Sequence, residues 1–391
     1  MAFVTGEMQT PGVVINDTTL RDGEQSPGVG FSTGEKVHIA LMLESAGVPE
    51  LEIGIPAMGE KERATIREIT GSLRQASTMA WCRMTHEDIR SACGLGLDWV
   101  DLSVPVSVQQ LKNKLNIPVK KLLSLCLENI RRAVDAGLSV CVGMEDASRA
   151  EDELLHRVVD IAGEAGARRV RFADTLGVLD PVSTYHKISD LRQRTDLQIE
   201  MHAHNDLGLA TANTLAAVDA GAYSVNTTVT GLGERAGNAA LEEVAVALNV
   251  LNKPQSDIDL ARLPALCRYL HIVSGRTLSP QKAIVGDYAF THESGVHIDG
   301  LLKDINNYQS FPPSLIGRKH HLVLGKHSGI HAIDAVYRQL GISLTRAQCE
   351  EIREALRDWS ETCKCVPGND DLMSLIDLTM TGGIHDYQYA G

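Results

Sequence analysis

Short β-rich segments alternate with longer helical ones along about the first 230 residues. At several junctions a helical stretch ends in an Ala-Gly pair or a single glycine, and an apolar run follows within a few residues. A glycine directly after the last helical turn suits the left-handed conformation that ends many helices. The junctions are Ala46-Gly47, Gly96, Ala136-Gly137, Ala165-Gly166 and Ala220-Gly221.

Eight strands are predicted in this region, at residues 13–17, 50–54, 78–83, 99–104, 139–143, 168–174, 197–204 and 223–229. Their apolar residues do not alternate cleanly with polar ones, which indicates burial on both faces of a parallel sheet. Eight strands alternating with helices predict an α/β fold, a (β/α)8 TIM barrel. The alternative, an open doubly wound sheet, fits the number and span of the strands less well.

The pattern changes beyond residue 255. Helices are predicted at 259–275 and 345–362, and a loop-rich stretch with many Gly, His and Pro residues lies between them. Such a stretch is unsuited to a core and indicates a lid or an interface. We therefore expect a catalytic barrel at 1–255, a linker helix and lid subdomain at 256–330, and a small C-terminal helical subdomain at 331–391.

The formal net charge is −13, which argues against nucleic acid as the main partner. An anionic substrate would then need local cations or a metal. None of the eight cysteines forms a C-x-x-C pair, as expected in a reducing compartment. The sequence has no signal-like N-terminus and no apolar run of about 18 residues. We expect a cytoplasmic protein that does not contact membranes.

The first polar cluster follows the first predicted strand, in the segment DTTLRDGEQSPG. It brings Asp17, Arg21, Asp22, Glu24 and Gln25 into nine residues. In a barrel of this kind, chemistry takes place where strands end and the following loops begin. An ordinary turn that leads into a helix cap is the alternative reading.

The second cluster is His202-Ala203-His204, at the end of the predicted seventh strand. Residues i and i+2 of a strand point to the same face, so two imidazoles there make half of a metal site. Asp22 is the best candidate for a third ligand. A divalent ion so held can chelate a 2-oxo acid and polarise its ketone, and Arg21 can stabilise the developing alkoxide. Histidines with only a structural role are the alternative.

Two further groups lie at strand ends. The segment GLGERAGNAALEE follows the eighth strand, where barrels often bind phosphate. Within it, Asn238 could reach the metal or simply start a helix. Glu145, at the end of the fifth strand, could be an acid–base group or an ordinary helix-cap residue.

Three long segments now show a resemblance: DTTLRDGEQSPG, HAHNDLGLATANTLAAVDAGA with its continuation VNTTVTGLGERAGN, and FTHESGVHIDG. The chain resembles the homocitrate synthase and 2-isopropylmalate synthase family, which shares its barrel with the HMG-CoA lyases. The resemblance runs from about residue 13 to 330. Within the family, AWCR, FADTLGVLDP and the compact C-terminus look most like the homocitrate synthases of nitrogen fixation.

The resemblance implies a role for each matching residue. The metal site would consist of Asp22, His202 and His204, with Asn238 close by. The catalytic residues would be Arg21, Glu145, His297 and the lid residue Tyr308. The substrate-binding residues would include Gln25, Glu52 and Thr175, the last of which would contact the oxo-acid carboxylate.

One departure from the family concerns the far end of the substrate. Lysine-pathway homocitrate synthases carry Glu at the position of Asp22 and Arg at that of Cys141. That Arg helps to hold the far carboxylate of 2-oxoglutarate. Arg83 or His86, near the end of the third strand, could replace it, and Asp101 completes the substrate-binding candidates.

The resemblance implies condensation of acetyl-CoA with 2-oxoglutarate to give homocitrate, for nitrogenase cofactor biosynthesis. It also implies a divalent metal (Mg, Mn, Zn, Fe or Co) and a homodimer in which each lid reaches the neighbouring barrel. Rival readings are 2-isopropylmalate or citramalate synthase, which use other 2-oxo acids. A barrel metallohydrolase is a rival of a different class, and it does not explain the LRDGEQ and GERAGN loops. A non-catalytic metal-binding or regulatory protein is a third class, and it would not need Arg21, Glu145 and a mobile lid together.

Overall fold

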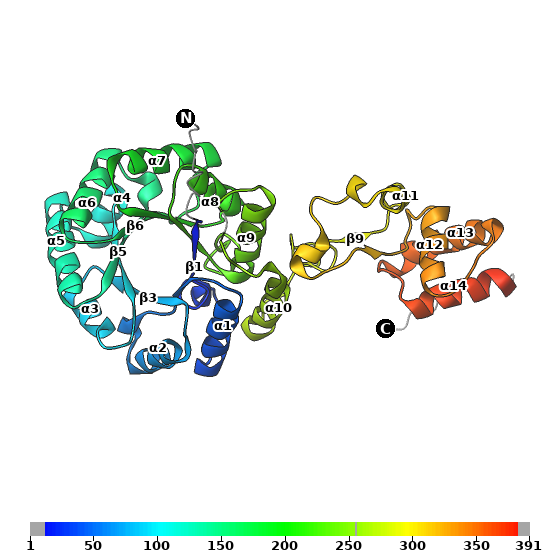
Figure 1. Cartoon of the computed structure of the whole chain (residues 1–391), viewed down its shortest axis with the longest axis horizontal. Coiled ribbons are helices and arrows are strands. Elements are labelled where there is room, and N and C mark those ends of the chain that lie inside the picture. Colours follow the sequence, from blue (N-terminus) through cyan, green and yellow to red (C-terminus); the bar gives the residue numbers. More distant parts are fainter. Residues whose placement is uncertain (1–11, 255, 382–391) are drawn as a thin grey trace, which may run out of the picture. The chain divides into compact units, whose positions relative to one another are not determined.

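The computed structural model describes residues 12–254 and 256–381, which form two compact units with their boundary after Leu278 (Figure 1). The first unit is a closed barrel of eight parallel strands with helices between them, which confirms the predicted (β/α)8 fold. The strands are β1 (Val14–Asp17), β2 (Glu50–Glu52), β3 (Ser77–Arg83), β4 (Trp99–Pro105), β5 (Ser139–Glu145), β6 (Arg169–Asp174), β7 (Gln198–Ala203) and β8 (Ser224–Thr227).

The strands follow one another around the barrel in sequence order, and β1 pairs with β8 to close it. In that closing pair Val14 lies opposite Ser224 and Asp17 lies opposite Thr227. Because all strands are parallel, their carboxyl ends meet at one rim of the barrel. The glycines at the five predicted junctions all have φ between 78° and 94°, the left-handed conformation expected there.

Helices separate the strands and cover the outside of the barrel (Figure 1). Sequence signals explain several helix starts: the side chain of Ser32 caps α1 together with Glu35, and Asp180 caps α7 directly before Pro181. The helices of this unit are α1 (Thr33–Ser45), α2 (Glu60–Ser72), α3 (His86–Ala92), α4 (Val108–Gln110), α5 (Val119–Asp135), α6 (Asp152–Glu164), α7 (Pro181–Arg194), α8 (Ala210–Asp219), α9 (Leu241–Val250) and α10 (Leu263–Ser274), with a short π-helix at Leu111–Leu115.

The inside of the barrel is charged. Arg169 pairs with Glu50 at 2.5 Å, and Arg171 pairs with Glu52 at 2.9 Å and with Glu200 at 2.6 Å. Strand β6 does not neighbour β2, so β6–β2 pairs can meet only across the barrel interior. Apolar residues of the same strands, such as Val170 and Phe172 beside the two arginines, are also fully buried. Because residues alternate along a strand, those apolar side chains face the helices.

The described residues of the second unit form a two-stranded sheet, β9 (Thr291–His292) and β10 (His321–Leu322), and four α-helices: α11 (Gly295–Lys303), α12 (Ile330–Gln339), α13 (Arg346–Cys363) and α14 (Asn369–Thr381). Helices α12, α13 and α14 pack around a small core that includes Tyr337, Leu356 and Trp359. The helix predicted at 345–362 is α13. The stretch expected to be loop-rich contains α11, which begins at Gly295. The predicted domain limits at 255 and 330 stay predictions.

Candidate active site

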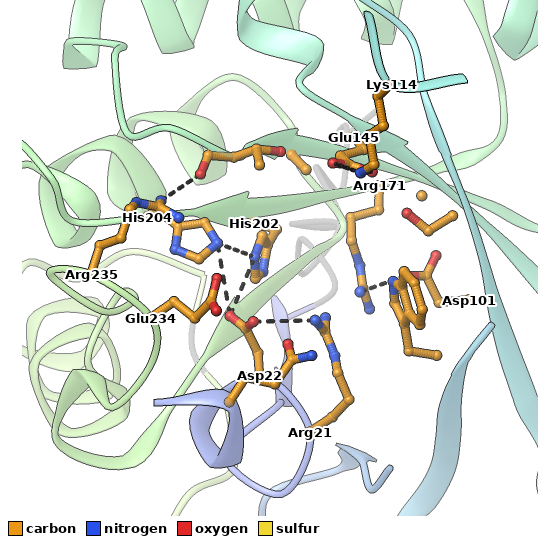
Figure 2. Close-up of a pocket in the computed structure, with 16 residues that line it drawn as sticks. Arg21, Asp22, Asp101, Lys114, Glu145, Arg171, His202, His204, Glu234 and Arg235 are labelled. Atoms are coloured by element: carbon orange, nitrogen blue, oxygen red, sulfur yellow. Dashed lines mark hydrogen bonds and ion pairs between the residues drawn. The ribbon is translucent and has the colours of Figure 1, made fainter. Parts of the chain in front are cut away.

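Three side chains converge at the carboxyl rim of the barrel. Asp22 comes from the loop after β1, His202 lies on β7, and His204 follows directly after β7. Their ligand atoms all lie within 4.8 Å of one another. The two Nε2 atoms are 3.2 Å apart, and they lie 3.7 and 3.8 Å from Oδ2 of Asp22 (Figure 2). We call these three residues the metal trio.

Local backbone structure positions each member of the trio. The carbonyl of Thr18 accepts hydrogen bonds from the backbone N–H groups of Arg21, Asp22 and Gly23, which folds the loop tightly over the end of β1. His204 forms a β-bridge with Asn238 of the loop after β8. Through that bridge, Asn238 Nδ2 can donate to Oδ2 of Asp22 at 2.7 Å. The loops after β1, β7 and β8 therefore hold one another in place.

The electrostatics of the trio suit a cation. Burial lowers the pKa of both histidines, so their imidazoles are neutral and can act as ligands. Burial also raises the pKa of Asp22, but the nearby charge of Arg21 and the hydrogen bond from Asn238 oppose it, and the pKa lies well below its usual range. Two neutral nitrogens and one carboxylate are a donor set that fits Mg, Mn, Fe, Co or Zn.

Arg21 connects the trio to the barrel interior. Its Nη1 lies 3.2 Å from Oδ1 of Asp22, and its Nη2 lies 2.6 Å from Oε2 of Glu52. Glu52 is fully buried and also accepts a hydrogen bond from Thr18 Oγ1 at 2.6 Å. Glu52 therefore acts beneath Arg21, where it fixes the direction of the guanidinium, and does not itself line the cavity.

A cavity of about 290 Å³ opens beside the trio. Several predicted site residues share it, and Figure 2 shows six of them with their labels. The residues predicted from the sequence that line it are Arg21, Asp22, Gln25, Asp101, Glu145, Thr175, His202 and His204. The lining residues that the sequence analysis missed are Trp81, Ser103, Lys114, Gly143, Arg171, Ala173, Glu234 and Arg235.

Glu145 and Thr175 have partners that the sequence analysis did not predict. Both carboxylate oxygens of Glu145 accept from Lys114 Nζ, at 2.6 and 2.9 Å. The hydroxyl of Thr175 accepts from the backbone N–H of Asp146 at 2.8 Å, and its carbonyl accepts from Arg235 at 2.6 Å. Lys114 lies in the π-helix, a form often found at functional sites. This local irregularity was not readable from the sequence pattern.

Besides Glu52 and Asn238, three further predicted residues are not among those that line the cavity. The guanidinium of Arg83 turns away to form two hydrogen bonds with Asp88, at 3.0 and 2.7 Å, and does not line the cavity. His297 and Tyr308 belong to the second unit, where their rings lie against each other with centroids 4.3 Å apart. The proposed catalytic pairing of His297 with Glu145 stays a prediction.

A closed barrel with two histidines, one carboxylate and an arginine at its carboxyl rim defines the class of the protein: a barrel enzyme with a candidate metal centre. The chain belongs to the HMGL-like family, whose model matches residues 12–269. Residues 284–364 match the family described as homocitrate synthase post-HMGL domain-like. The family confirms the resemblance seen in the sequence, and the enzyme is an acyltransferase.

The curated relatives match nearly the whole chain. It is 45% identical to homocitrate synthase 1 of Nostoc sp. over 93% of this chain and 97% of the relative. It is 42% identical to 2-isopropylmalate synthase 2 of Caldanaerobacter subterraneus over 95% and 97%. A protein named as a citramalate synthase of Methanopyrus kandleri is also 42% identical, over 88% of this chain and 68% of its own length.

Solved structures support the fold alone. The HMG-CoA lyase of Bacillus subtilis superposes with a TM-score of 0.60 at 20% identity, over 69% of this chain and 97% of that chain. No described helix is both long and apolar enough to cross a membrane.

Proposed function

We propose that the enzyme condenses acetyl-CoA with 2-oxoglutarate and water to give homocitrate and CoA, and that it serves nitrogenase cofactor biosynthesis. The observation that carries the proposal is the convergence of Asp22, His202 and His204 within 4.8 Å, with Arg21 at 3.2 Å from that carboxylate. A homocitrate synthase that matches 93% of the chain supports the choice of reaction.

Several steps of the reaction have a candidate group in the chain. A divalent metal held by the metal trio would polarise the keto group as a Lewis acid. Arg21 is placed to stabilise the negative charge that develops on the keto oxygen. Thr175 would orient the adjoining carboxylate, and Gln25 lines the same cavity.

Carbon–carbon bond formation needs a carbanion from the acetyl group. A base removes one methyl proton of acetyl-CoA, the enolate carbon attacks the keto carbon, and the keto oxygen gains a proton to become a hydroxyl. Water then cleaves the thioester and releases CoA. Glu145 is a candidate for the base because it lines the cavity, where its carboxylate pairs with Lys114 at 2.6 Å.

His297 and Tyr308 would act from the lid of a neighbouring subunit in a homodimer. Their mutual stacking in the second unit gives the two side chains one common orientation. The proposal predicts subunit complementation: His297→Ala and Arg21→Ala are each inactive alone, and mixed dimers regain turnover. Two inactive variants that stay inactive after mixing would exclude lid exchange.

A second candidate substrate comes from the relatives, since a 2-isopropylmalate synthase matches 95% of the chain at 42% identity. That reaction would use 2-oxoisovalerate in place of 2-oxoglutarate, and citramalate synthase would use pyruvate.

The deciding experiment measures thiol release from acetyl-CoA with each of three 2-oxo acids: 2-oxoglutarate, 2-oxoisovalerate and pyruvate. We expect CoA release only when an oxo acid is present, with the highest kcat/KM for 2-oxoglutarate. A higher kcat/KM for 2-oxoisovalerate would overturn the substrate but keep the reaction class. CoA release that does not depend on any oxo acid would reject condensation altogether.

A further inference from the structure

The loop after β8, residues 230–238, has a strained backbone. Thr230 has φ 59° and Arg235 has φ 53°, in the left-handed region that residues other than glycine rarely adopt. Gly237 has φ 85°, and a Cβ atom there would collide with the carbonyl oxygen of Gly231. Such strain persists only where the surrounding structure holds it, and it is concentrated at functional sites. The loop is therefore a candidate for a further functional element at the rim of the barrel.

The side chain of Arg235 anchors this loop. Its Nε donates to Oδ1 of Asp206 at 2.8 Å, and its Nη2 donates to Oδ2 of Asp206 at 3.0 Å and to the carbonyl of Thr175 at 2.6 Å. These bonds connect the loop to the segments that follow β7 and β6. The carbonyl of Glu234 also accepts from the backbone N–H of Gly237 at 2.8 Å. The backbone at Glu234, directly before the anchored arginine, is therefore held in place.

Glu234 differs from the other acidic residues of the cavity. The carboxylates that line the cavity are those of Asp22, Asp101, Glu145 and Glu234. Asp22 belongs to the metal trio, and Asp101 accepts from an arginine of β6 at 2.8 Å. Glu145 pairs with Lys114 at 2.6 Å. The carboxylate of Glu234 has no hydrogen-bond or ion-pair partner in the described part of the chain (Figure 2).

The place of Glu234 suits a reaction with water. Its side chain is exposed as well as lining the cavity, so water can reach the carboxylate. Figure 2 shows it on the same side of the view as Asp22 and His204, away from Glu145. The cavity thus has two acidic groups outside the metal trio that face it from different sides, one paired with a lysine and one without a partner.

The proposed reaction needs two proton transfers from different atoms. The first removes a methyl proton of acetyl-CoA, and Glu145 is the candidate base for it. The second removes a proton from the water that cleaves the thioester of the condensed acyl-CoA. In that intermediate a single CH2 group separates the thioester carbon from the former keto carbon, so both steps take place in the same cavity.

We propose that Glu234 is the general base for hydrolysis of the acyl-CoA intermediate. This inference rests on the proposed function and divides the two proton transfers between Glu145 and Glu234. A carboxylate without a partner suits the role, because protonation of a paired one would also break its ion pair. The strained loop then has a clear use, since it fixes this carboxylate over the cavity.

The atoms and electrons of the step balance as follows. Glu234 accepts a proton from water while the water oxygen bonds to the thioester carbonyl carbon. When the C–S bond breaks, its electron pair leaves with the sulfur. Glu234 returns the proton to that sulfur to give the thiol of CoA, and the new carboxyl group of the product ionises.

Glu234→Gln tests the proposal because it keeps the size of the side chain and removes the proton acceptor. Excess enzyme with Mn²⁺ and the preferred 2-oxo acid of the wild type is mixed with acetyl-CoA, quenched with acid and analysed by mass spectrometry. We expect the variant to consume acetyl-CoA and accumulate the condensed acyl-CoA. Release of CoA should fall at least about 100-fold, the lower range for loss of a general base. The wild type should release CoA without such accumulation.

Rescue by formate separates proton transfer from a structural role in the loop. Glu234→Ala leaves space for a small carboxylate, so added formate should restore part of the CoA release in proportion to its concentration. The same formate should not restore Glu234→Gln, in which the amide fills that space. A side chain that only stabilised the loop would not be replaced by a diffusing anion.

Glu87 provides the matched control. It is an exposed glutamate in the first turn of α3, directly after β3, and it does not line the cavity. Glu87→Gln should therefore release CoA at the rate of the wild type, with no acyl-CoA accumulation.

Failure of this inference differs from failure of the proposed function. A wild type that releases no CoA with any 2-oxo acid would overturn both. With an active wild type, unchanged CoA release in Glu234→Gln would overturn the inference alone. So would a variant that no longer consumes acetyl-CoA, since the block would then precede hydrolysis, or a Glu234→Ala variant that formate does not accelerate.

Discussion

The metal trio and the charged barrel interior lie next to each other and are bridged by Arg21, yet they are built in opposite ways. In the trio, three ligand atoms face one another, and Nδ1 of both histidines has no hydrogen-bond partner among the residues described. In the interior, Arg171 alone has three carboxylate partners within 2.9 Å. The trio is organised for a ligand, whereas the interior is organised to hold the barrel together.

This difference separates function from stability. Side chains poised for a ligand contribute little to the fold without it, so their loss should affect turnover first. Buried ion pairs behave otherwise, because removing one partner leaves an uncompensated charge. Substitutions in the trio should therefore lower turnover, whereas substitutions in the interior should lower the free energy of unfolding.

The largest expected effect is the loss of turnover in His202→Ala. Removing one ligand should lower kcat/KM with acetyl-CoA and 2-oxoglutarate at least about a thousandfold, roughly 4 kcal/mol of transition-state stabilisation. The melting temperature of the metal-free protein should change little. A divalent ion should raise the melting temperature of the wild type and not that of the variant.

A matched histidine provides the control. His156 on α6 pairs with Asp190 at the surface of the barrel, so His156→Ala should keep both turnover and stabilisation by metal. Near-normal turnover in His202→Ala would remove the trio from the mechanism.

The second largest effect should appear in the charged barrel interior. Arg171→Met leaves Glu52, Asp101 and Glu200 buried without their common partner, which should lower the free energy of unfolding by on the order of 3 kcal/mol. Chemical denaturation measures this loss. Metal should still stabilise the variant, because the trio is intact.

The exposed arginine Arg67 on α2 provides the comparison. It pairs with Glu60 at the surface, and Arg67→Met should cost less than about 1 kcal/mol. Equal losses in the two arginine variants would contradict the description of the interior as a stabilising charge network.

The same contrast explains what could be predicted from the sequence. The strands and the trio could be predicted because their signals in the sequence are local. These signals are the Ala-Gly junctions, the spacing of His202 and His204, and the polar loop around Asp22. Parallel strands bring their carboxyl ends to one rim, so position along the chain was enough to predict convergence.

The interior network depends on long-range partners. Arg169 and Arg171 are two residues apart and share one face of β6, which is the available signal in the sequence. Their partners Glu50 and Glu52 lie on a strand 119 residues away, and only the barrel geometry brings them together. The place of Arg83 at the end of a strand predicts a substrate-binding role. In the structure its guanidinium forms a hydrogen bond with the nearby Asp88.

The smallest of the three effects concerns Asn238, which supports the metal trio from the loop after β8. Its Nδ2 donates to Asp22 at 2.7 Å and to the carbonyl of Leu232 at 3.1 Å, while its Oδ1 has no hydrogen-bond partner within the described ranges. This orientation makes it a positioning residue for the carboxylate ligand. Loss of such a supporting hydrogen bond typically weakens metal binding about 10–100-fold.

Asn238→Ala should therefore weaken the affinity for Mn²⁺ by that factor, as measured by calorimetry, with most of the turnover restored at saturating metal. A direct ligand would behave like His202, with turnover that excess metal does not restore. The variant thus decides whether Asn238 is a direct ligand or a positioning residue. It also tests the difference between the trio and the interior. Loss of a residue that only supports the trio should weaken metal binding and leave the free energy of unfolding unchanged.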